Sequence, residues 1–282
     1  MPPARIFLLT LLAMIAFAGN SLLCRLALKN TGIDPASFTT IRLISGAIML
    51  CLIVGLQRKK ISSAGNWLSA FALFAYAAGF SFAYIHLTAA AGALLLFSAV
   101  QATMLGYGFW AGERLKALQI AGLVLALAGL LLLLLPGVSA PPISSSLLMI
   151  GAGVAWGIYS LRGRGTSDAT LATTGNFLRA AAIAVILSVS MMAKQSLDNA
   201  GIAYAICSGA LTSGIGYAIW YNALPALKAS TAATVQLSVP VIAALGGIVL
   251  LNEAISLRII FASVAILGGI ALVIMQKNNK AS

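Results

Sequence analysis

The side chains that could do chemistry in this sequence are aromatic and polar residues placed at helical spacing inside apolar segments. Three segments carry such a stripe: Tyr76, Phe80 and Tyr84; Trp156, Tyr159 and Ser160; Ser213, Tyr217, Trp220 and Tyr221. Residues three or four apart share one face of a helix. The stripes therefore predict a cavity that binds a partly apolar molecule, with Tyr76, Phe80, Trp156, Tyr159 and Tyr217 as ring contacts. The alternative is a packed aromatic seam between helices.

Uncharged amides also occur within apolar segments, at Asn20, Gln101, Asn176 and Gln236. Leaving their donors unpaired in an apolar environment would cost several kcal/mol, so each must bond to a neighbouring helix, to water in a cavity or to a ligand. Gln236 is the favoured ligand contact, because Pro240 frees a backbone carbonyl one turn back. Asn20 and Gln101 are further candidates for ligand contacts.

Two arginines, Arg42 and Arg179, lie about two turns into apolar segments. A buried guanidinium is costly unless it is paired, and in membranes such residues are candidates for function. The two occupy matching places in the sequence repeat described below, which favours a structural clamp to neighbouring carbonyls. A direct contact with substrate is the alternative.

Three titratable residues near the ends of apolar segments are candidates for a proton or gating role: His86, Glu113 and Glu253. A carboxylate that precedes a helix can cap its free amides, so the favoured reading for Glu113 and Glu253 is a cap on the helix that follows. Histidine changes charge near physiological pH, but the place of His86 also fits an ordinary residue at the membrane interface.

Other chemistries are disfavoured. The cysteines, Cys24, Cys51 and Cys207, have no short spacing, so neither a disulfide framework nor a metal knuckle is indicated. A single histidine excludes a zinc site built on paired histidines. An intramembrane enzyme would need a nucleophile with a base, or a metal cluster, and the sequence offers neither. We expect no catalytic residue, no metal and no cofactor.

The composition is that of an integral membrane protein: 61% of the 282 residues are hydrophobic, 8% are charged, and the mean hydropathy is +1.04. A bilayer core of about 30 Å takes roughly 20 apolar residues per helix. On that scale ten spans are predicted: 5–28, 36–56, 67–87, 89–111, 117–135, 145–162, 170–193, 201–224, 229–251 and 256–275. The expected fold class is therefore an all-α integral membrane protein with ten transmembrane helices.

The basic residues predict an orientation. With the amino terminus in the cytoplasm, eleven Lys and Arg residues fall on the inner side and four on the outer side, so both termini are expected to be cytoplasmic. The net charge of +12 then fits anionic lipid headgroups, and no basic tract interleaved with aromatics suggests nucleic acid. In this orientation Trp220, Tyr221 and Asn222 fall in the last cytoplasmic turn, as an aromatic belt, and Tyr217 lies deeper.

An internal repeat divides the chain into halves, 1–140 and 141–282. AGERLKALQIAGLVLALAG at 111–129 matches LNEAISLRIIFASVAILGG at 251–269, aligning Glu113 with Glu253. The first helix pairs with the sixth through three further matches: Phe17 with Trp156, Ser21 with Ser160, and Arg25 with Arg164. This pairing makes the first helix part of the fold, although Arg5 and the AFA that follows could also suggest a cleaved signal. Five helices per half is an odd number, so the halves are inverted, as in alternating-access carriers.

At this point the sequence resembles the drug/metabolite transporter superfamily, in particular its EamA branch, which includes the YddG-type amino-acid exporters. The resemblance covers the whole chain and rests on the two halves, on DPASFTTIRLISGA at 34–47, and on GYAIWYNALPALKASTAATVQLSVPVIAALGG at 216–247. It implies export of small metabolites through a cavity lined by helices one, three, four, six, eight and nine. The chain departs from the pattern at Val100, where the branch often has a proline, and it lacks the first-helix glutamate with which the smallest members bind cationic drugs.

The sequence therefore predicts a multi-pass carrier in the bacterial cytoplasmic membrane, and it is compatible with a monomer. It would export small metabolites, with aromatic or other partly apolar amino acids favoured, by alternating access across a central cavity. The alternative is efflux of aromatic or quaternary-ammonium drugs through cation–π contacts. The inverted repeat argues against a scaffold without transport. Uniport and proton antiport both stay open, because no midplane acid is present.

Overall fold

The structure is a computed structural model that describes residues 2–58, 64–110, 117–135, 140–163, 166–227 and 235–278. Nearly all of the described chain is helical. The first half contributes α1 (Pro3–Asn30), α2 (Pro35–Leu56), α3 (Trp67–Tyr84), α4 (Ala89–Trp110) and α5 (Ala117–Leu134). The second half begins with α6 (Ile143–Gly163), α7 (Ala169–Ser190) and the short η1 (Met192–Lys194).

The rest of the second half consists of a broken eighth span and two final helices. The eighth span contains α8 (Asn199–Cys207), the π-helix η2 (Ser208–Ile215), α9 (Gly216–Ala223) and η3 (Leu224–Ala226), followed by α11 (Ser238–Leu251) and α12 (Leu257–Asn278). Eight spans of the described chain are long and apolar enough to cross a membrane, and Ser238–Leu251 and Leu257–Leu272 are shorter apolar helices. The predicted all-α membrane fold is confirmed.

Aspartates begin three of these helices. Asp34 accepts hydrogen bonds from the Ala36 and Ser37 amides of α2, Asp168 accepts one from Leu171 of α7, and Asp198 accepts one from Gly201 of α8. A side-chain oxygen at this position satisfies amides that the helix leaves unpaired, for a stabilisation of about 1 kcal/mol each. Three of the five acids in the chain are thereby committed to helix ends.

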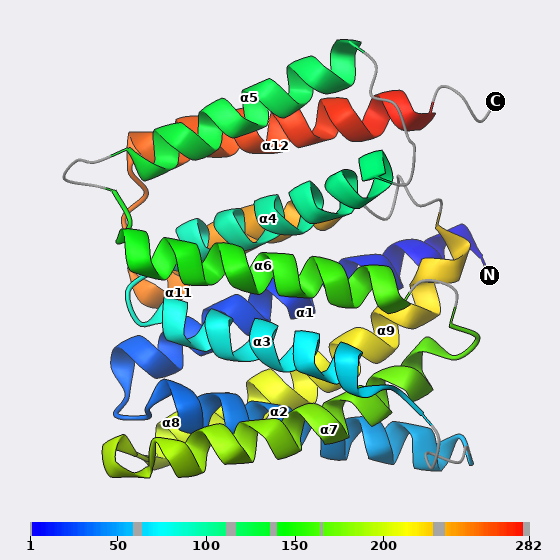
Figure 1. Cartoon of the computed structure of the whole chain (residues 1–282), viewed down its shortest axis with the longest axis vertical. Coiled ribbons are helices and arrows are strands. Elements are labelled where there is room, and N and C mark those ends of the chain that lie inside the picture. The colour runs from blue at the N-terminus through cyan, green and yellow to red at the C-terminus, as the bar shows by residue number, and fades with distance from the viewer. Residues whose placement is uncertain are drawn as a thin grey trace.

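The helices pack in the pattern of an inverted repeat. In Figure 1 they lie side by side, and α1 begins at the same end of the bundle at which α12 ends. Helix α6 packs on α3 and α4, and its counterpart α1 packs on the eighth span and α11, while α2 pairs with α7 and α5 with α12. These contacts between the halves are thus matched pairwise under the repeat.

The pair formed by α5 and α12 repeats this symmetry at the level of single residues. A Cβ at Gly129 would lie 3.0 Å from the Ile266 amide nitrogen, and one at Gly269 would lie 2.7 Å from that of Ala126. Offsets of 140 relate both the glycines and their neighbours. The two helices touch backbone to backbone here because neither position carries a side chain, and Figure 1 places this pair at the edge of the bundle.

Candidate functional site

An aromatic cluster occupies the region where the two halves meet. Its centre is Trp156 of α6, whose ring stacks on Tyr159 at 5.3 Å and on Tyr217 of α9 at 5.2 Å between centroids. Tyr76 of α3 lies 4.9 Å from the same ring. Pairs in such geometry are worth about 0.5–1.5 kcal/mol each beyond the area that they bury. We use the name aromatic cluster for eight of the contacting rings: Phe17, Tyr76, Phe80, Trp156, Tyr159, Phe177, Tyr217 and Tyr221.

A buried polar network adjoins the cluster. Asn20 of α1 donates to the Tyr76 hydroxyl at 3.2 Å and accepts from the Ser208 hydroxyl at 2.7 Å. Arg42 of α2 donates from Nη2 to the same Tyr76 oxygen at 3.0 Å, and its Nε lies 3.4 Å from the Ser213 oxygen. The network therefore links α1, α2 and α3 of the first half to the eighth span of the second.

The π-helix η2 supplies the second half of this network. Its residues Ser208 and Ser213 are buried, and Gly209 lies against the backbone of Arg42 so closely that a Cβ would clash with the Arg42 carbonyl and the Ser45 hydroxyl. π-Helical turns are rare and are frequent at functional sites. The wider turn brings both serines toward α1 and α2.

Arg42 is the most unusual charged residue in the described chain. Its side chain is 2% exposed, it lies 5.2 Å from the Tyr76 ring centroid and 5.0 Å from that of Phe80, and its Nη1 has no hydrogen-bond partner. A buried donor without a partner costs about 1–3 kcal/mol. The cation–π contacts favour the charge by about 1 kcal/mol each but leave that donor unpaired.

The predicted clamp is therefore right for one arginine and wrong for the other. Arg179 donates from Nη1 to the carbonyls of Ala64 at 2.6 Å and Gly175 at 2.8 Å. The hydrogen bonds of Arg42 instead go to side-chain hydroxyls at the cluster. The repeat preserves the residue but not its surroundings, because η2 has no counterpart in α3.

A small central hollow lies between the cluster and the network. Its volume is about 20 Å³, which is enough for about one water molecule. The residues that line it come from both halves: Phe17, Asn20, Ser21, Tyr76, Phe80, Leu96, Phe97, Trp156, Thr212, Ser213 and Tyr217. Five predicted contacts, Asn20, Tyr76, Phe80, Trp156 and Tyr217, are thus brought together, in a closed conformation.

Tyr159 faces a second hollow of about 30 Å³ that is also lined by Asn66, Arg162, Asn176 and Tyr221. The Tyr159 hydroxyl donates to Thr173 at 3.2 Å. Because Tyr159 also stacks on Trp156, it separates this hollow from the central one. The two hollows lie along the face of α6 that carries Trp156 and Tyr159, the face that the sequence stripe predicted.

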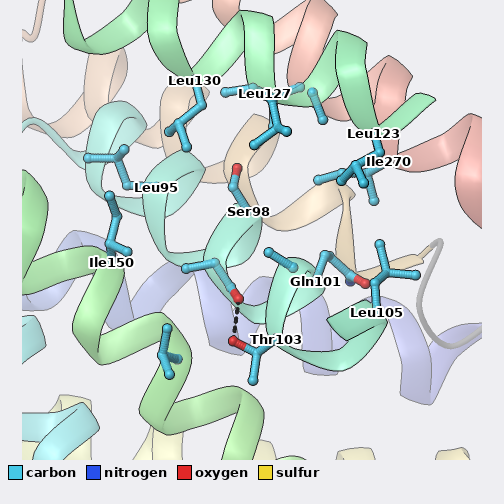
Figure 2. Close-up of a pocket in the computed structure, with 15 residues that line it drawn as sticks. Leu95, Ser98, Gln101, Thr103, Leu105, Leu123, Leu127, Leu130, Ile150 and Ile270 are labelled. Atoms are coloured by element: carbon cyan, nitrogen blue, oxygen red, sulfur yellow. Dashed lines mark hydrogen bonds between the residues drawn. The ribbon is translucent and has the colours of Figure 1, made fainter. Parts of the chain in front are cut away.

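Gln101 lies elsewhere. A larger cavity of about 160 Å³ lies between α4, α5, α6 and α12. Figure 2 shows Gln101, Ser98 and Thr103 among its lining side chains, which are otherwise aliphatic. The Ser98 and Thr103 hydroxyls bond to carbonyls of their own helix, those of Leu94 and Ala99. This cavity is apolar and does not join Gln101 to the aromatic cluster.

One ion pair ties the halves together at the end of the bundle where α1 ends. Arg25 Nε donates to Glu253 Oε1 at 3.0 Å, and the two side chains are 11% and 7% exposed. Arg25 Nη1 also donates to the carbonyls of Tyr84 at 2.9 Å and Ile85 at 2.8 Å, at the end of α3. Glu253 Oε2 accepts from the Ala89 amide, which begins α4, at 2.8 Å.

This arrangement corrects the expected role of Glu253. It does cap a helix, but the helix is α4 of the other half and not α12, which follows it in the chain. The reason is Asn252, whose left-handed conformation, with φ of 51°, ends α11 and turns the chain back. Its repeat partner Glu113 lies outside the described residues.

The remaining predicted residues lie at the ends of helices. His86 is exposed between α3 and α4, and Gln236 is half buried just before α11. Val235 and Gln236 are helical and α11 begins at Ser238, so Pro240 lies in the first turn of α11, where the missing amide is tolerated. The predicted span 229–251 begins outside the described residues, so the mid-span position expected of Pro240 stays a prediction. Trp220 is 7% exposed and packs on Phe17, so its assignment to a lipid-facing belt was wrong, whereas Asn222 is exposed.

Two parts of this site, Ser208 and the π-helix η2, were not predicted. Ser208 was missed because a serine inside an apolar run has no distinctive spacing.

Outside the spans, one carboxyl has a shifted pKa: hydrogen bonds from the Gly201 amide, and from that of Gly32, lower the pKa of the Asp198 carboxyl. In the described chain no group of three or more His, Cys, Asp or Glu could hold a metal ion.

Comparison with known proteins gives one family. The model of the EamA-like transporter family matches twice, at residues 4–135 and 143–275. Uncharacterized protein PA1977 of Pseudomonas aeruginosa is 55% identical over 100% of this chain and 99% of its own length. The uncharacterized transporter YoaV of Bacillus subtilis is 24% identical over 84% of this chain and 86% of its own. A solved structure titled only as the crystal structure of a protein shares the fold, with a TM-score of 0.71, 19% identity and full coverage of both chains.

Proposed function

Because the chain belongs to the EamA-like transporter family, we propose that it exports small, partly apolar metabolites, amino acids foremost, by alternating access at the aromatic cluster. Membership makes it a membrane transporter with a small-molecule substrate. The substrate, the route and the residues are the proposal. We assign no catalytic step to the chain.

The observation that carries the proposal is the position of Trp156. It stacks on Tyr159 within its own helix and on Tyr217 of the eighth span, and faces Tyr76 from the other half. Inverted-repeat carriers bind substrate near the midplane where the halves meet. Aromatic faces beside the Asn20 and Ser208 hydrogen-bond network suit a molecule with an apolar body and a polar group.

The closed hollow supports alternating access. A drug-sized ligand needs a pocket of about 300–1,000 Å³, whereas the central hollow is about 20 Å³. Substrate entry therefore requires α1, α3, α6 and the eighth span to separate. The Arg25–Glu253 pair joins the halves at one end, so its breakage would accompany opening there.

Efflux of quaternary-ammonium drugs is the weaker alternative. The Arg42 guanidinium already lies 5.2 Å from the Tyr76 ring centroid, so a second cation on the opposite face of that ring would lie about 10 Å from it, where the repulsion is about 2 kcal/mol at an effective dielectric constant of about 20. That repulsion cancels the gain of about 1–2 kcal/mol from a cation–π contact. The structure therefore favours substrates without a net positive charge.

We place the chain in the bacterial cytoplasmic membrane with both termini in the cytoplasm. The basis is the excess of basic residues on that side in the sequence, together with the common end at which α1 begins and α12 ends (Figure 1). In this orientation the Arg25–Glu253 pair lies at the outer end.

A transport screen tests the proposal. The purified full chain is reconstituted in liposomes, and uptake of labelled L-phenylalanine, L-leucine and benzyltrimethylammonium is compared with and without a pH gradient. We expect saturable uptake of an amino acid above that of empty liposomes. Uptake of the quaternary amine alone would contradict the amino-acid assignment, and a response to the gradient would distinguish proton antiport from uniport.

A further inference from the structure

We propose that Arg42 recognises the carboxylate of the transported molecule, so that the substrate class is aromatic or partly apolar monocarboxylates. This inference rests on the proposed function and deepens it, because it names the chemical group that the site selects. The ammonium group of an amino acid is, on this account, dispensable for binding.

The first argument is the free donor beside the hollow. Arg42 contacts Tyr76, Phe80 and Ser213, and all three line the central hollow. Its Nη1 is buried and has no partner. Guanidinium groups present parallel N–H donors that match the two oxygens of a carboxylate, so a carboxylate that reaches Arg42 between these lining residues would satisfy the donor that the protein leaves unpaired.

The second argument is the balance of charge. Four of the five acids of the chain lie in the described residues, and each is engaged away from Arg42. Asp34, Asp168 and Asp198 cap α2, α7 and α8, and Glu253 pairs with Arg25. Within the described chain the buried charge of Arg42 therefore has no acidic partner, and an anionic ligand would provide one.

The third argument is the contrast with its repeat partner. Arg179 donates hydrogen bonds from Nη1 to the carbonyls of Ala64 and Gly175, as expected for an arginine that holds helices together. A purely structural Arg42 would be expected to bond backbone in the same way. It faces hydroxyls and aromatic rings at the cluster instead.

The single guanidinium also limits the charge of the ligand. One cation in a buried site matches one negative charge, and a dianion would leave a charge uncompensated. The rings of Phe17, Trp156 and Tyr217, which also line the hollow, fit the apolar part of the molecule. A monocarboxylate such as 3-phenylpropionate has both features without an ammonium group.

Matched analogues test the inference on the wild-type chain. Labelled L-phenylalanine is bound to the full chain in lipid nanodiscs and displaced by one of two analogues that both keep the phenyl ring. 3-Phenylpropionate keeps the carboxylate and lacks the ammonium, whereas phenylalaninol keeps the ammonium and lacks the carboxylate. We expect 3-phenylpropionate to compete within about threefold of L-phenylalanine, and phenylalaninol to compete at least tenfold more weakly. Equal or better competition by phenylalaninol would overturn the inference.

Arginine variants provide the second arm. Arg42→Gln and Arg42→Lys are expected to weaken L-phenylalanine binding at least tenfold, with the smaller loss in Arg42→Lys, which keeps the charge but not the planar donor pair. Arg179→Gln is the matched control, in which melting temperature falls and affinity is unchanged. If a variant misfolds, the displacement experiment with the analogues still tests carboxylate recognition, because it uses the wild-type chain.

The outcomes separate the two proposals. Binding that is unchanged in a folded Arg42→Gln variant overturns carboxylate recognition and leaves the carrier function intact. An absence of both binding and transport of L-phenylalanine and of 3-phenylpropionate contradicts carboxylate recognition and the amino-acid assignment together.

Discussion

Replacing Glu253 by Gln should shift the protein toward a conformation open at the outer end. The substitution keeps an acceptor for the Ala89 amide but removes the charge that pairs with Arg25 at 3.0 Å. Breaking a buried pair by neutralising one partner costs about 3 kcal/mol or more, and that cost falls on the closed state if the pair separates on opening. A change of 1.4 kcal/mol is tenfold in an equilibrium constant, so the open fraction should rise roughly a hundredfold.

Cysteine accessibility measures this shift. Ser21, one helical turn before Arg25, is 1% exposed and lines the central hollow, so Ser21→Cys reports whether the hollow is open. The three native cysteines are first replaced by Ala. In right-side-out vesicles we expect a membrane-impermeant maleimide to label the reporter much faster in Glu253→Gln than in the parent, up to about a hundredfold.

The control is Lys194→Gln, which changes an exposed charge at the same end and should leave the labelling rate unchanged. A labelling rate within twofold of the parent in a folded Glu253→Gln variant would refute the view that this pair holds the outer end closed.

Three further predictions follow from single contacts. Gly209→Ala should lower the unfolding free energy by about 1–3 kcal/mol, because its Cβ would clash with the Arg42 carbonyl; an unchanged melting temperature would contradict the close packing of η2. Tyr217→Ala should reduce transport more than tenfold and Tyr217→Phe less, since only Ala removes the ring that stacks on Trp156, with chromatography to check folding; equal rates in wild type and both variants would exclude a substrate contact. The pKa of Asp198 is lowered by its hydrogen bonds, so its stabilisation is complete above the ordinary aspartate pKa and is lost as pH falls through the lowered value. The melting temperatures of wild type and Asp198→Asn should therefore converge as pH falls below the ordinary aspartate pKa. A difference in melting temperature that stays constant with pH would argue against this stabilisation by Asp198.

Most of the fold could be predicted from the sequence because the bilayer fixes the length of each span. The predicted span 36–56 and the helix α2 (Pro35–Leu56) agree within one residue. The eighth span was expected as one uniform helix, and the π-helix η2 went unpredicted. Hydropathy measures how apolar a segment is, and a π-helical turn differs from an α-helical turn in hydrogen bonding, which leaves no mark on hydropathy.

The site was less predictable, because it depends on which helices become neighbours. The stripe on α6 indicated that Trp156 and Tyr159 share a face, but the sequence could not say that Tyr217 would stack on it. Gln101 and Asn20 showed the same sequence pattern, a side-chain amide within an apolar run. Packing alone placed Asn20 at the central hollow and Gln101 at another cavity.

Arg42 and Arg179 illustrate the limit of the repeat. The alignment predicted equal roles, and the structure gives them unequal ones, since only Arg179 bonds backbone carbonyls. A sequence repeat preserves residue types, whereas the partners of a charge are set by the tertiary neighbours.

The central claim is that one site at the aromatic cluster is exposed to each side of the membrane in turn. Counterflow tests it most directly: liposomes that contain the protein and are loaded with unlabelled L-phenylalanine are diluted into a trace of the labelled amino acid. The account predicts transient accumulation of label above equilibrium, abolished in Trp156→Ala, whose ring lies at the centre of the cluster. Uptake that is the same in loaded and unloaded liposomes, or that Trp156→Ala leaves unchanged, would contradict it.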